Sequence, residues 1–88
     1  TFFVYILVSK KDQSFYIGQT QNLQARIDKH NKGYNLASRS KIPWKLLYVF
    51  KVESRTEAMK LEKKLKAIKK RTSILAFIEK DKHINNEL

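Results

Sequence analysis

Runs of β-branched and aromatic residues, separated by polar turns, predict three β-strands in this chain. Phe2–Val8 is almost wholly apolar, which is typical of a central strand buried on both faces. Ser14–Gln19 follows after a short polar turn, so the two strands are expected to pair as an antiparallel hairpin. Gly18 within the second strand indicates either a bulge or a close approach to the backbone. The third strand is expected at Lys45–Val52, after Pro43.

The first helix is predicted by a capping residue and by apolar positions at helical spacing. Asn22 can cap a helix over residues 23–31, and Leu23 and Ile27, four positions apart, would face the core. The segment Tyr34–Pro43 is polar and basic and has only a weak helical pattern. We therefore expect it to connect the first helix to the third strand.

Two further helices are expected near the end of the chain. Ser54-Arg55-Thr56-Glu57 fits a capping box, and the helix after it is predicted to run to about Lys70. Its apolar stripe consists of Ala58, Leu61, Leu65 and Ile68. A short last helix is expected to begin near Thr72 or Ser73. The polar segment Asp81–Leu88 is predicted to fray.

This order of elements predicts an α+β fold in which a three-stranded antiparallel sheet is flanked by about three helices, in the order β-β-α-β-α-α. The length of 88 residues suits a single domain over residues 1–88 with one modest core. No apolar run approaches the ~20 residues that cross a bilayer, and Phe2–Val8 is too short for a secretory signal. The lack of cysteine excludes disulfides and thiolate zinc sites, which favours a cytoplasmic location.

The charge of the chain indicates what kind of partner it binds. The net charge is +11, from 19 basic and 8 acidic residues. Such an excess favours a polyanion: nucleic acid, or less often an anionic membrane surface. The plainer alternative is a basic surface that only keeps the protein in solution. Charge alone does not indicate any chemistry.

Two tyrosine motifs give the first indication of chemistry. Val4-Tyr5-Ile6-Leu7 and Tyr16-Ile17-Gly18-Gln19-Thr20, with ten residues between the tyrosines, resemble the paired signature of GIY-YIG nucleases. The first tripeptide reads Phe3-Val4-Tyr5, so the tyrosine is kept and the glycine is not. Further similar motifs follow in order: Leu23-Gln24-Ala25-Arg26-Ile27 with His30-Asn31, Pro43-Trp44-Lys45-Leu46-Leu47-Tyr48, and Glu57-Ala58 with Glu62. The order and spacing of these motifs make the resemblance specific.

The resemblance implies an endonuclease that hydrolyses phosphodiester bonds in DNA with one Mg²⁺ or Mn²⁺ ion. It makes Tyr5 the base, Arg26 the ligand of the scissile phosphate and Glu62 the metal ligand. The residue types suit these roles, because cations favour a phenolate, a guanidinium binds phosphate with two hydrogen bonds, and Mg²⁺ can use one protein carboxylate and several waters. Tyr16 would orient the attacking water or bind phosphate. His30 would bind phosphate or protonate the leaving group.

Each of these residues also has a purely structural interpretation. The tyrosines could be half-buried strand residues whose hydroxyls reach water. Arg26 and His30 could be surface residues of their helix, and Glu62 could pair with Lys63 or Lys66. For the whole protein, the alternative is a non-catalytic nucleic-acid-binding module with the same fold. Binding alone, however, needs neither the glutamate nor the tyrosine pair.

Basic residues in the loops around the expected site are predicted to contact backbone phosphates without reading the base sequence. They are Lys10, Lys11, Lys29, Lys32, Arg39 and Lys41. The expected partner is therefore nucleic acid, most of all DNA, in a setting such as repair or recombination. Because so small a domain offers a small interface, a partner protein or a homodimer is expected to supply targeting.

Overall fold

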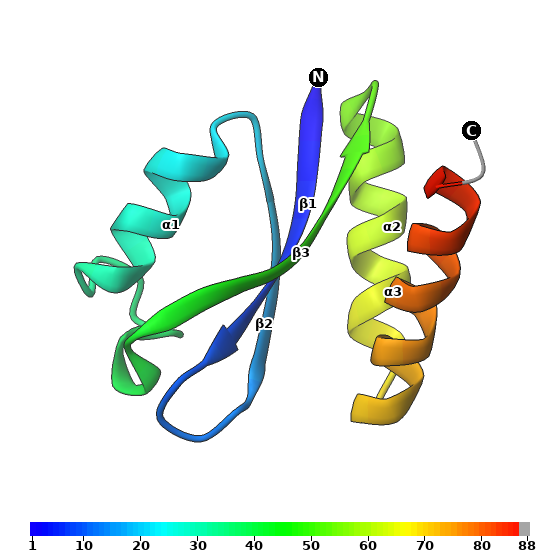
Figure 1. Ribbon diagram of the computed structural model, residues 1–88. Helices are drawn as coiled ribbons and strands as arrows, with labels where there is room; N and C mark the ends of the chain where they lie inside the picture. Colours follow the sequence, from blue (N-terminus) through cyan, green and yellow to red (C-terminus); the bar gives the residue numbers. More distant parts are fainter. Residues whose placement is uncertain (87–88) are drawn as a thin grey trace.

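The computed structural model describes residues 1–86 and contains one sheet with helices on both of its faces (Figure 1). The elements are β1 (Phe2–Ser9), β2 (Phe15–Thr20), α1 (Leu23–Asn31), the short 3₁₀ helix η1 (Arg39–Lys41), β3 (Trp44–Val52), α2 (Arg55–Ala67) and α3 (Arg71–Asn86). The predicted element order and the α+β class are confirmed. None of the helices in the described part of the chain is long and apolar enough to cross a membrane.

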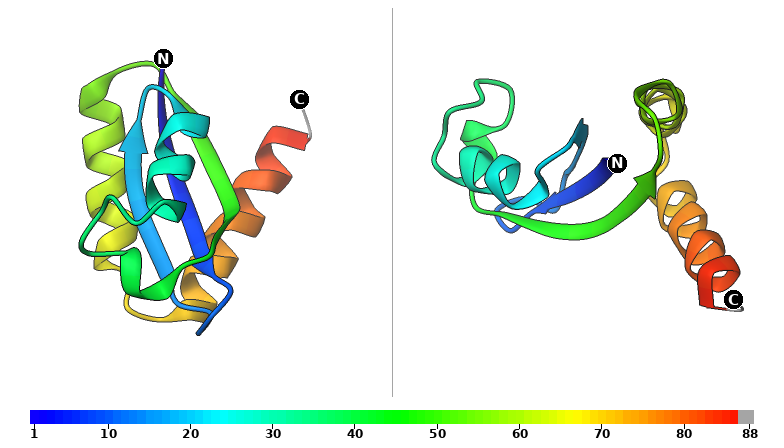
Figure 2. Two further views of the ribbon diagram at one scale, coloured as in Figure 1. Left: turned by 90° about the vertical axis from the view of Figure 1, so that its left-hand side faces the viewer. Right: turned by 90° about the horizontal axis from the view of Figure 1, so that it is seen from above.

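The sheet has the strand order β2-β1-β3, and β1 pairs antiparallel with both neighbours. Its central position explains why β1 is apolar at successive positions, since side chains alternate between the two faces. Val4 and Ile6 belong to a core shared with α2 and α3, whereas Tyr5 and Leu7 belong to a core that α1 covers. Seen from above, α1 lies on one side of the sheet and the other two helices lie on the opposite side (Figure 2).

The caps of α1 and α2 are close to those predicted. The Asn22 side chain accepts a hydrogen bond from the Ala25 N–H at 3.1 Å. Ser54 Oγ accepts one from the Glu57 N–H at 3.1 Å, and the Glu57 carboxylate accepts the N–H of Glu53 at 3.0 Å. These bonds satisfy N–H groups at helix starts that would otherwise lack partners.

Two expectations about the C-terminal helices are wrong. The second helix ends at Ala67 and not near Lys70, because Ile68 is extended, with φ −78° and ψ 115°. The segment from Asp81 was expected to fray, yet α3 continues to Asn86; residues 87 and 88 lie outside the described residues. Sequence pattern missed this because the segment is fixed by a tertiary contact.

That contact joins α3 to the edge strand β3. The Tyr48 hydroxyl donates a hydrogen bond to the Asp81 carboxylate at 2.5 Å, and the Lys82 ammonium lies 5.7 Å from the centre of the Tyr48 ring. Immediately before it, Ile74 and Ile78 are buried in the core. The helix is therefore attached to the sheet beyond its last buried apolar residue.

Replacing the hydroxyl of Tyr48 tests this attachment. Tyr48→Phe should lower the free energy of unfolding by about 1–2 kcal/mol, because a hydrogen bond to a charged group is lost. Amide exchange in the last turns of α3 should become faster, as measured by NMR. Tyr34→Phe is the matched control, since Tyr34 is 72% exposed, and it should change neither quantity. Unchanged exchange in Tyr48→Phe would show that the bond does not hold the helix end.

Candidate active site

Tyr5 lies across the neighbouring strand β2, and Gly18 makes room for it. The two residues are opposite each other in the β1–β2 pairing, so their side-chain positions share one face of the sheet. A Cβ atom on residue 18 would lie 2.5 Å from the Tyr5 hydroxyl oxygen and 2.7 Å from its ring Cζ. The pairing is regular at Gly18, so the predicted close approach is confirmed and the predicted bulge is not present. The Tyr5 hydroxyl is thus carried over β2, the outer strand of the sheet.

Behind the Tyr5 hydroxyl lies a buried histidine. The hydroxyl is 3.1 Å from Nε2 of His30, and Nδ1 of the same ring is 2.7 Å from Oγ of Ser38. His30 and Ser38 are fully buried. Burial, and after it the positive charge of Arg26, lower the pKa of His30, so its ring is neutral near pH 7. The interpretation of His30 as a surface residue is therefore wrong, since both ring nitrogens have partners inside the protein; its contact with phosphate or a leaving group stays a prediction.

Tyr16 completes an aromatic cluster beside this pair. Its ring is stacked with Tyr5 at a centroid distance of 6.5 Å and meets the edge of the His30 ring at 4.6 Å. The Tyr16 hydroxyl accepts a hydrogen bond from Nδ2 of Asn35 at 3.2 Å. Both hydroxyls are therefore held by α1 and the loop that follows it. The β1–β2 hairpin alone does not provide these partners.

Two charges of opposite sign act on the Tyr5 hydroxyl. Burial raises its pKa well above the usual value for a phenol; the neighbouring Tyr16 and the carboxylate of Glu62 raise it further, whereas the guanidinium of Arg26 lowers it. Tyr5 is therefore neutral in the protein alone. Arg26 and Glu62 thus both affect the ionisation of this hydroxyl, and their part in a reaction stays a prediction.

Arg26 and Glu62 flank β2 from the two faces of the sheet. Arg26 is exposed on α1. Glu62, on α2, is 21% exposed; its Oε2 accepts a hydrogen bond from Nε2 of Gln19 at 3.4 Å, and its Oε1 lies 3.6 Å from the Lys66 ammonium. Gln19 follows Gly18 in β2, so its side chain points to the α2 face. The pairing of Glu62 with Lys66, which is the structural alternative to a metal ligand, is thus present, and the role of Glu62 as a metal ligand stays a prediction.

The donor set around Glu62 suits a metal ion that keeps most of its waters. Within residues 1–86, no group of three or more His, Cys, Asp or Glu residues could hold a metal ion. Both contacts of the Glu62 carboxylate are long, at 3.4 and 3.6 Å, so its oxygens retain the capacity to bind a cation. Mg²⁺ accepts one carboxylate when waters and phosphate oxygens complete its octahedron.

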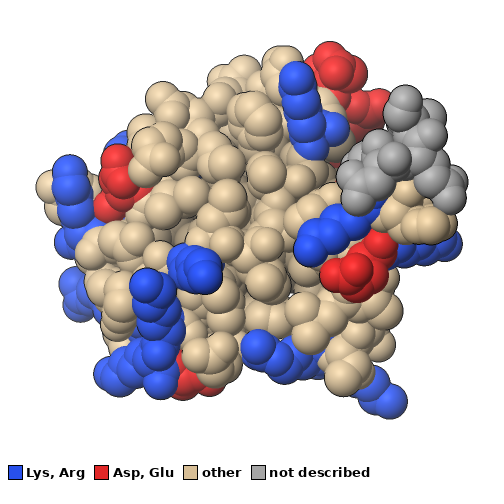
Figure 3. Space-filling model, in the orientation of Figure 1, with Lys and Arg blue, Asp and Glu red and all other residues tan. Residues whose placement is uncertain are grey.

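The predicted phosphate-contacting residues fall into two groups. Lys29 lies on α1 beside Arg26, where both line a hollow of about 620 Å³. Lys11 and Lys41 are engaged near the β1–β2 turn: Nζ of Lys11 donates to the Ser40 carbonyl and Nζ of Lys41 lies 3.3 Å from the Asp12 carboxylate. The others, Lys10, Lys32 and Arg39, are exposed. Figure 3 shows basic side chains gathered over the turn and η1; their contact with phosphate stays a prediction.

Three polar residues of the site were not anticipated from the sequence: Gln19, Asn35 and Ser38. Gln19 stands beside Gly18 in a recognisable motif, and strand alternation could have indicated that it faces α2. Asn35 and Ser38 lie in an irregular segment without periodicity. Only the folded loop shows that their side chains reach Tyr16 and His30.

A sheet that carries two neighbouring tyrosines, with an arginine and a glutamate from helices on its two faces, is the architecture expected of a GIY-YIG domain. The family model described as the GIY-YIG catalytic domain matches residues 1–75. The chain therefore belongs to the GIY-YIG family.

The similar proteins are UPF0213 proteins, whose names state no function. One from Oceanobacillus iheyensis is 39% identical over 67 residues, which cover 75% of this chain and 77% of that protein. Another, from Streptococcus pneumoniae serotype 4, is 34% identical over 84 residues, which cover 94% of this chain and 83% of that protein. The solution NMR structure of UPF0213 protein BH0048 from Bacillus halodurans has a TM-score of 0.55 and 32% identity, and the match covers 86% of this chain and 81% of that one. This structural match supports the same fold.

The close approach of Tyr5 to Gly18 can be tested by a double-mutant cycle. Gly18→Ala should lower the free energy of unfolding by about 1–3 kcal/mol, because the added methyl group overlaps the buried Tyr5 ring. The φ of Gly18 is not positive, so the backbone itself accepts alanine. In the Tyr5→Ala background the same change should therefore cost almost nothing. Urea unfolding of the four proteins measures both effects; an equal cost in both backgrounds would contradict the proposed overlap.

The buried neutral ring of His30 predicts a pH dependence of stability. Because its pKa is lower in the folded than in the unfolded chain, its contribution is complete above about pH 6.5 and is lost as the pH falls through the folded value. The stability difference between wild type and His30→Gln should therefore shrink on acidification. Urea unfolding at pH 7.5 and pH 5 measures it, and His83→Gln, at an exposed position, is the control. A difference that does not change with pH would contradict the neutral state.

Proposed function

We propose that this protein is a metal-dependent endonuclease that hydrolyses phosphodiester bonds in DNA. One observation carries the proposal: beside Gly18, over which the Tyr5 hydroxyl lies, Gln19 is hydrogen-bonded to Glu62 and lines a hollow together with Arg26. Three separate elements bring a buried phenol, a guanidinium and a carboxylate to the same strand. Packing of the fold does not require this combination of groups. Hydrolysis of a phosphodiester requires a base, a cation for the phosphate and a metal ligand.

Arg26 is suited to bind the scissile phosphate. Its guanidinium is exposed on α1, next to Lys29 in the same hollow. A planar guanidinium can donate two parallel hydrogen bonds to phosphate oxygens and stabilise the charge that develops on them. Lys29 would add positive charge without fixing the geometry.

Tyr5 is suited to act as a base once its phenol is ionised. A bound cation at the site would add the positive charge that the buried phenol lacks, which favours the phenolate, and the phenolic proton would pass to solvent water. Nε2 of the neutral His30 ring lies 3.1 Å from the hydroxyl, and Ser38 holds the other ring nitrogen. His30 is thus a positioning residue for Tyr5, and Tyr16, whose ring is stacked with that of Tyr5, would orient the attacking water.

Glu62 would hold one Mg²⁺ or Mn²⁺ ion. When bound, the ion would supply positive charge to the phosphoryl and leaving oxygens. The Lys66 ammonium, 3.6 Å from the carboxylate, now supplies the positive charge that such an ion would supply. The long side chain of Lys66 is 56% exposed and can turn away to solvent.

Cleavage assays with matched variants test the proposal. Supercoiled and single-stranded DNA, incubated with Mg²⁺ or Mn²⁺, should be cut by the wild type, and EDTA should abolish cutting. Glu62→Gln and Arg26→Ala should each reduce the rate about 100-fold or more, because each removes charge stabilisation from the transition state. Glu79→Gln, an exposed glutamate paired with Lys82 on α3, is the control and should cut normally.

Binding measured in parallel separates this proposal from the alternative. Glu62→Gln should bind DNA at least as well as the wild type, since a negative charge is removed. If the wild type binds DNA but does not cut any substrate, the domain is a non-catalytic binding module. If both site variants cut at the wild-type rate, the assignment of the site is wrong.

A further inference from the structure

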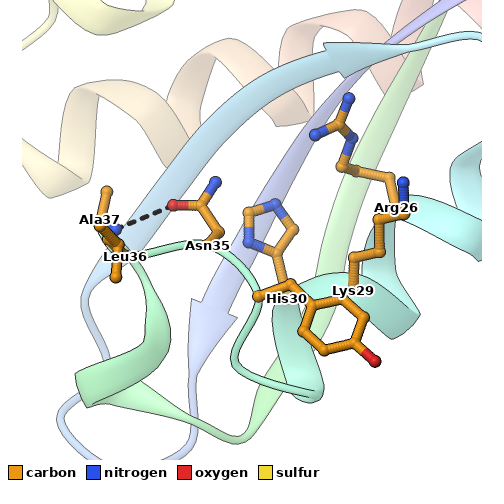
Figure 4. A pocket seen from close by; sticks show the side chains of 7 residues that line it. Arg26, Lys29, His30, Asn35, Leu36 and Ala37 are labelled. Atoms are coloured by element: carbon orange, nitrogen blue, oxygen red, sulfur yellow. Dashed lines mark hydrogen bonds between the residues drawn. The ribbon is translucent and has the colours of Figure 1, made fainter.

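The hollow that Arg26 and Lys29 line extends to loop residues that take no part in the proposed reaction. It lies between α1 and the loop that follows it, and its volume is about 620 Å³. Arg26 and Lys29 line it from the helix, and Asn35 and Leu36 line it from the loop, with His30 between them (Figure 4). Its size falls within the range of small-ligand sites.

Two large side chains of this lining are left in solvent. Tyr34 is 72% exposed and Leu36 is 75% exposed, and both border the same hollow. Burying either in the core would stabilise the fold, so their joint exposure at one concave place indicates a surface that contacts something else. An aromatic ring and an aliphatic side chain in one lining both offer apolar surface to an occupant.

The electrostatics of the hollow favour an anion. Arg26 and Lys29 contribute two positive charges, and none of the described residues that line it is acidic. An occupant that combines a flat apolar part with negative charge matches both features. A nucleotide has this combination, since its base stacks on aromatic rings and its phosphate binds cations.

The hollow is also continuous with the candidate active site. Asn35 in its wall donates a hydrogen bond to the Tyr16 hydroxyl, and its Oδ1 accepts the N–H of Ala37. On its other side, Arg26 borders a second hollow of about 340 Å³, lined also by Gln21, Asn22 and Arg55. A strand whose phosphate is bound at Arg26 can therefore place one base in the first hollow while its backbone continues over the second.

We propose that the hollow at Tyr34 and Leu36 binds one unpaired nucleobase next to the phosphate held by Arg26, so that the protein prefers single-stranded DNA at its site. The inference rests on the proposed function for its substrate. The inference adds a substrate preference to the proposed function. Paired bases inside a duplex have both faces stacked and do not offer a free face to Tyr34, so a duplex cannot fill the hollow in this way. Tyr34 is then a residue that determines specificity and takes no part in the chemistry.

Binding without cleavage tests this inference. A fluorescently labelled single strand of about 12 nucleotides, which is within the usual site size, and a hairpin duplex closed by a linker without bases and with the same number of phosphates are titrated in EDTA and low salt. The wild type should bind the single strand more tightly. Tyr34→Ala should weaken single-strand binding about 5- to 100-fold, the range expected for one lost stacking contact, and should leave hairpin binding nearly unchanged. Tyr34→Phe, which keeps the ring, should bind like the wild type.

The controls separate stacking from other causes. Met59→Ala changes another exposed apolar residue, 55% exposed on α2, and should have no effect on either ligand. If Tyr34→Ala binds the single strand like the wild type, or loses both ligands equally, the inference is overturned. Because binding is measured in EDTA, this outcome is independent of cleavage. Loss of selectivity in Tyr34→Ala together with a wild type that never cuts would overturn the nuclease proposal and leave the base site standing.

Discussion

The site depends on one steric arrangement, in which the ring of Tyr5 lies over a residue that has no side chain. Gly18 is opposite Tyr5 in the antiparallel pairing, and any Cβ there would lie within 2.7 Å of two atoms of the tyrosine side chain. A tyrosine on a central strand would otherwise be confined among core residues. With Gly18 beside it, its hydroxyl reaches the outer strand, where groups from both faces of the sheet can approach it. The backbone pairing of two strands thus determines where the chemistry can take place.

The hydroxyl is then fixed by a region that has little regular structure. His30, at the end of α1, joins Tyr5 to Ser38, while Asn35 binds Tyr16 and Trp44 Nε1 donates to the Ser38 carbonyl at 2.9 Å. These bonds leave no buried side-chain nitrogen or oxygen in the described part of the chain without a partner. A buried polar network of this kind stabilises a fold only when every member is satisfied. The loop after α1 therefore holds the tyrosines in place and forms a wall of the hollow beside Arg26.

Much of the fold follows from local pattern. The continuous apolar run of β1, the close approach at Gly18 and the caps at Asn22 and Ser54 are each visible within a few residues, and each was predicted. The end of α3 was not, because its order depends on Tyr48, which is 33 positions away from Asp81. For the site, the resemblance supplied the residue types, and the structure shows the elements that carry them: Tyr5 on β1, Arg26 on α1 and Glu62 on α2. The burial of His30 could not be anticipated, since an Arg and a His four apart on a helix look equally exposed in a sequence.

The charged groups around the Tyr5 hydroxyl connect this geometry to the hollow beside Arg26. At Tyr5, burial and the Glu62 carboxylate oppose ionisation, and Arg26 alone favours it, so the phenol remains neutral until further positive charge arrives. The same Arg26 borders the hollow lined by the exposed Tyr34 and Leu36. An anion bound beside Arg26 in that hollow would therefore also change the balance of charge at the Tyr5 hydroxyl, because one guanidinium acts on both places. The hollow and the hydroxyl are thus coupled electrostatically, and what occupies the first affects the ionisation of the second.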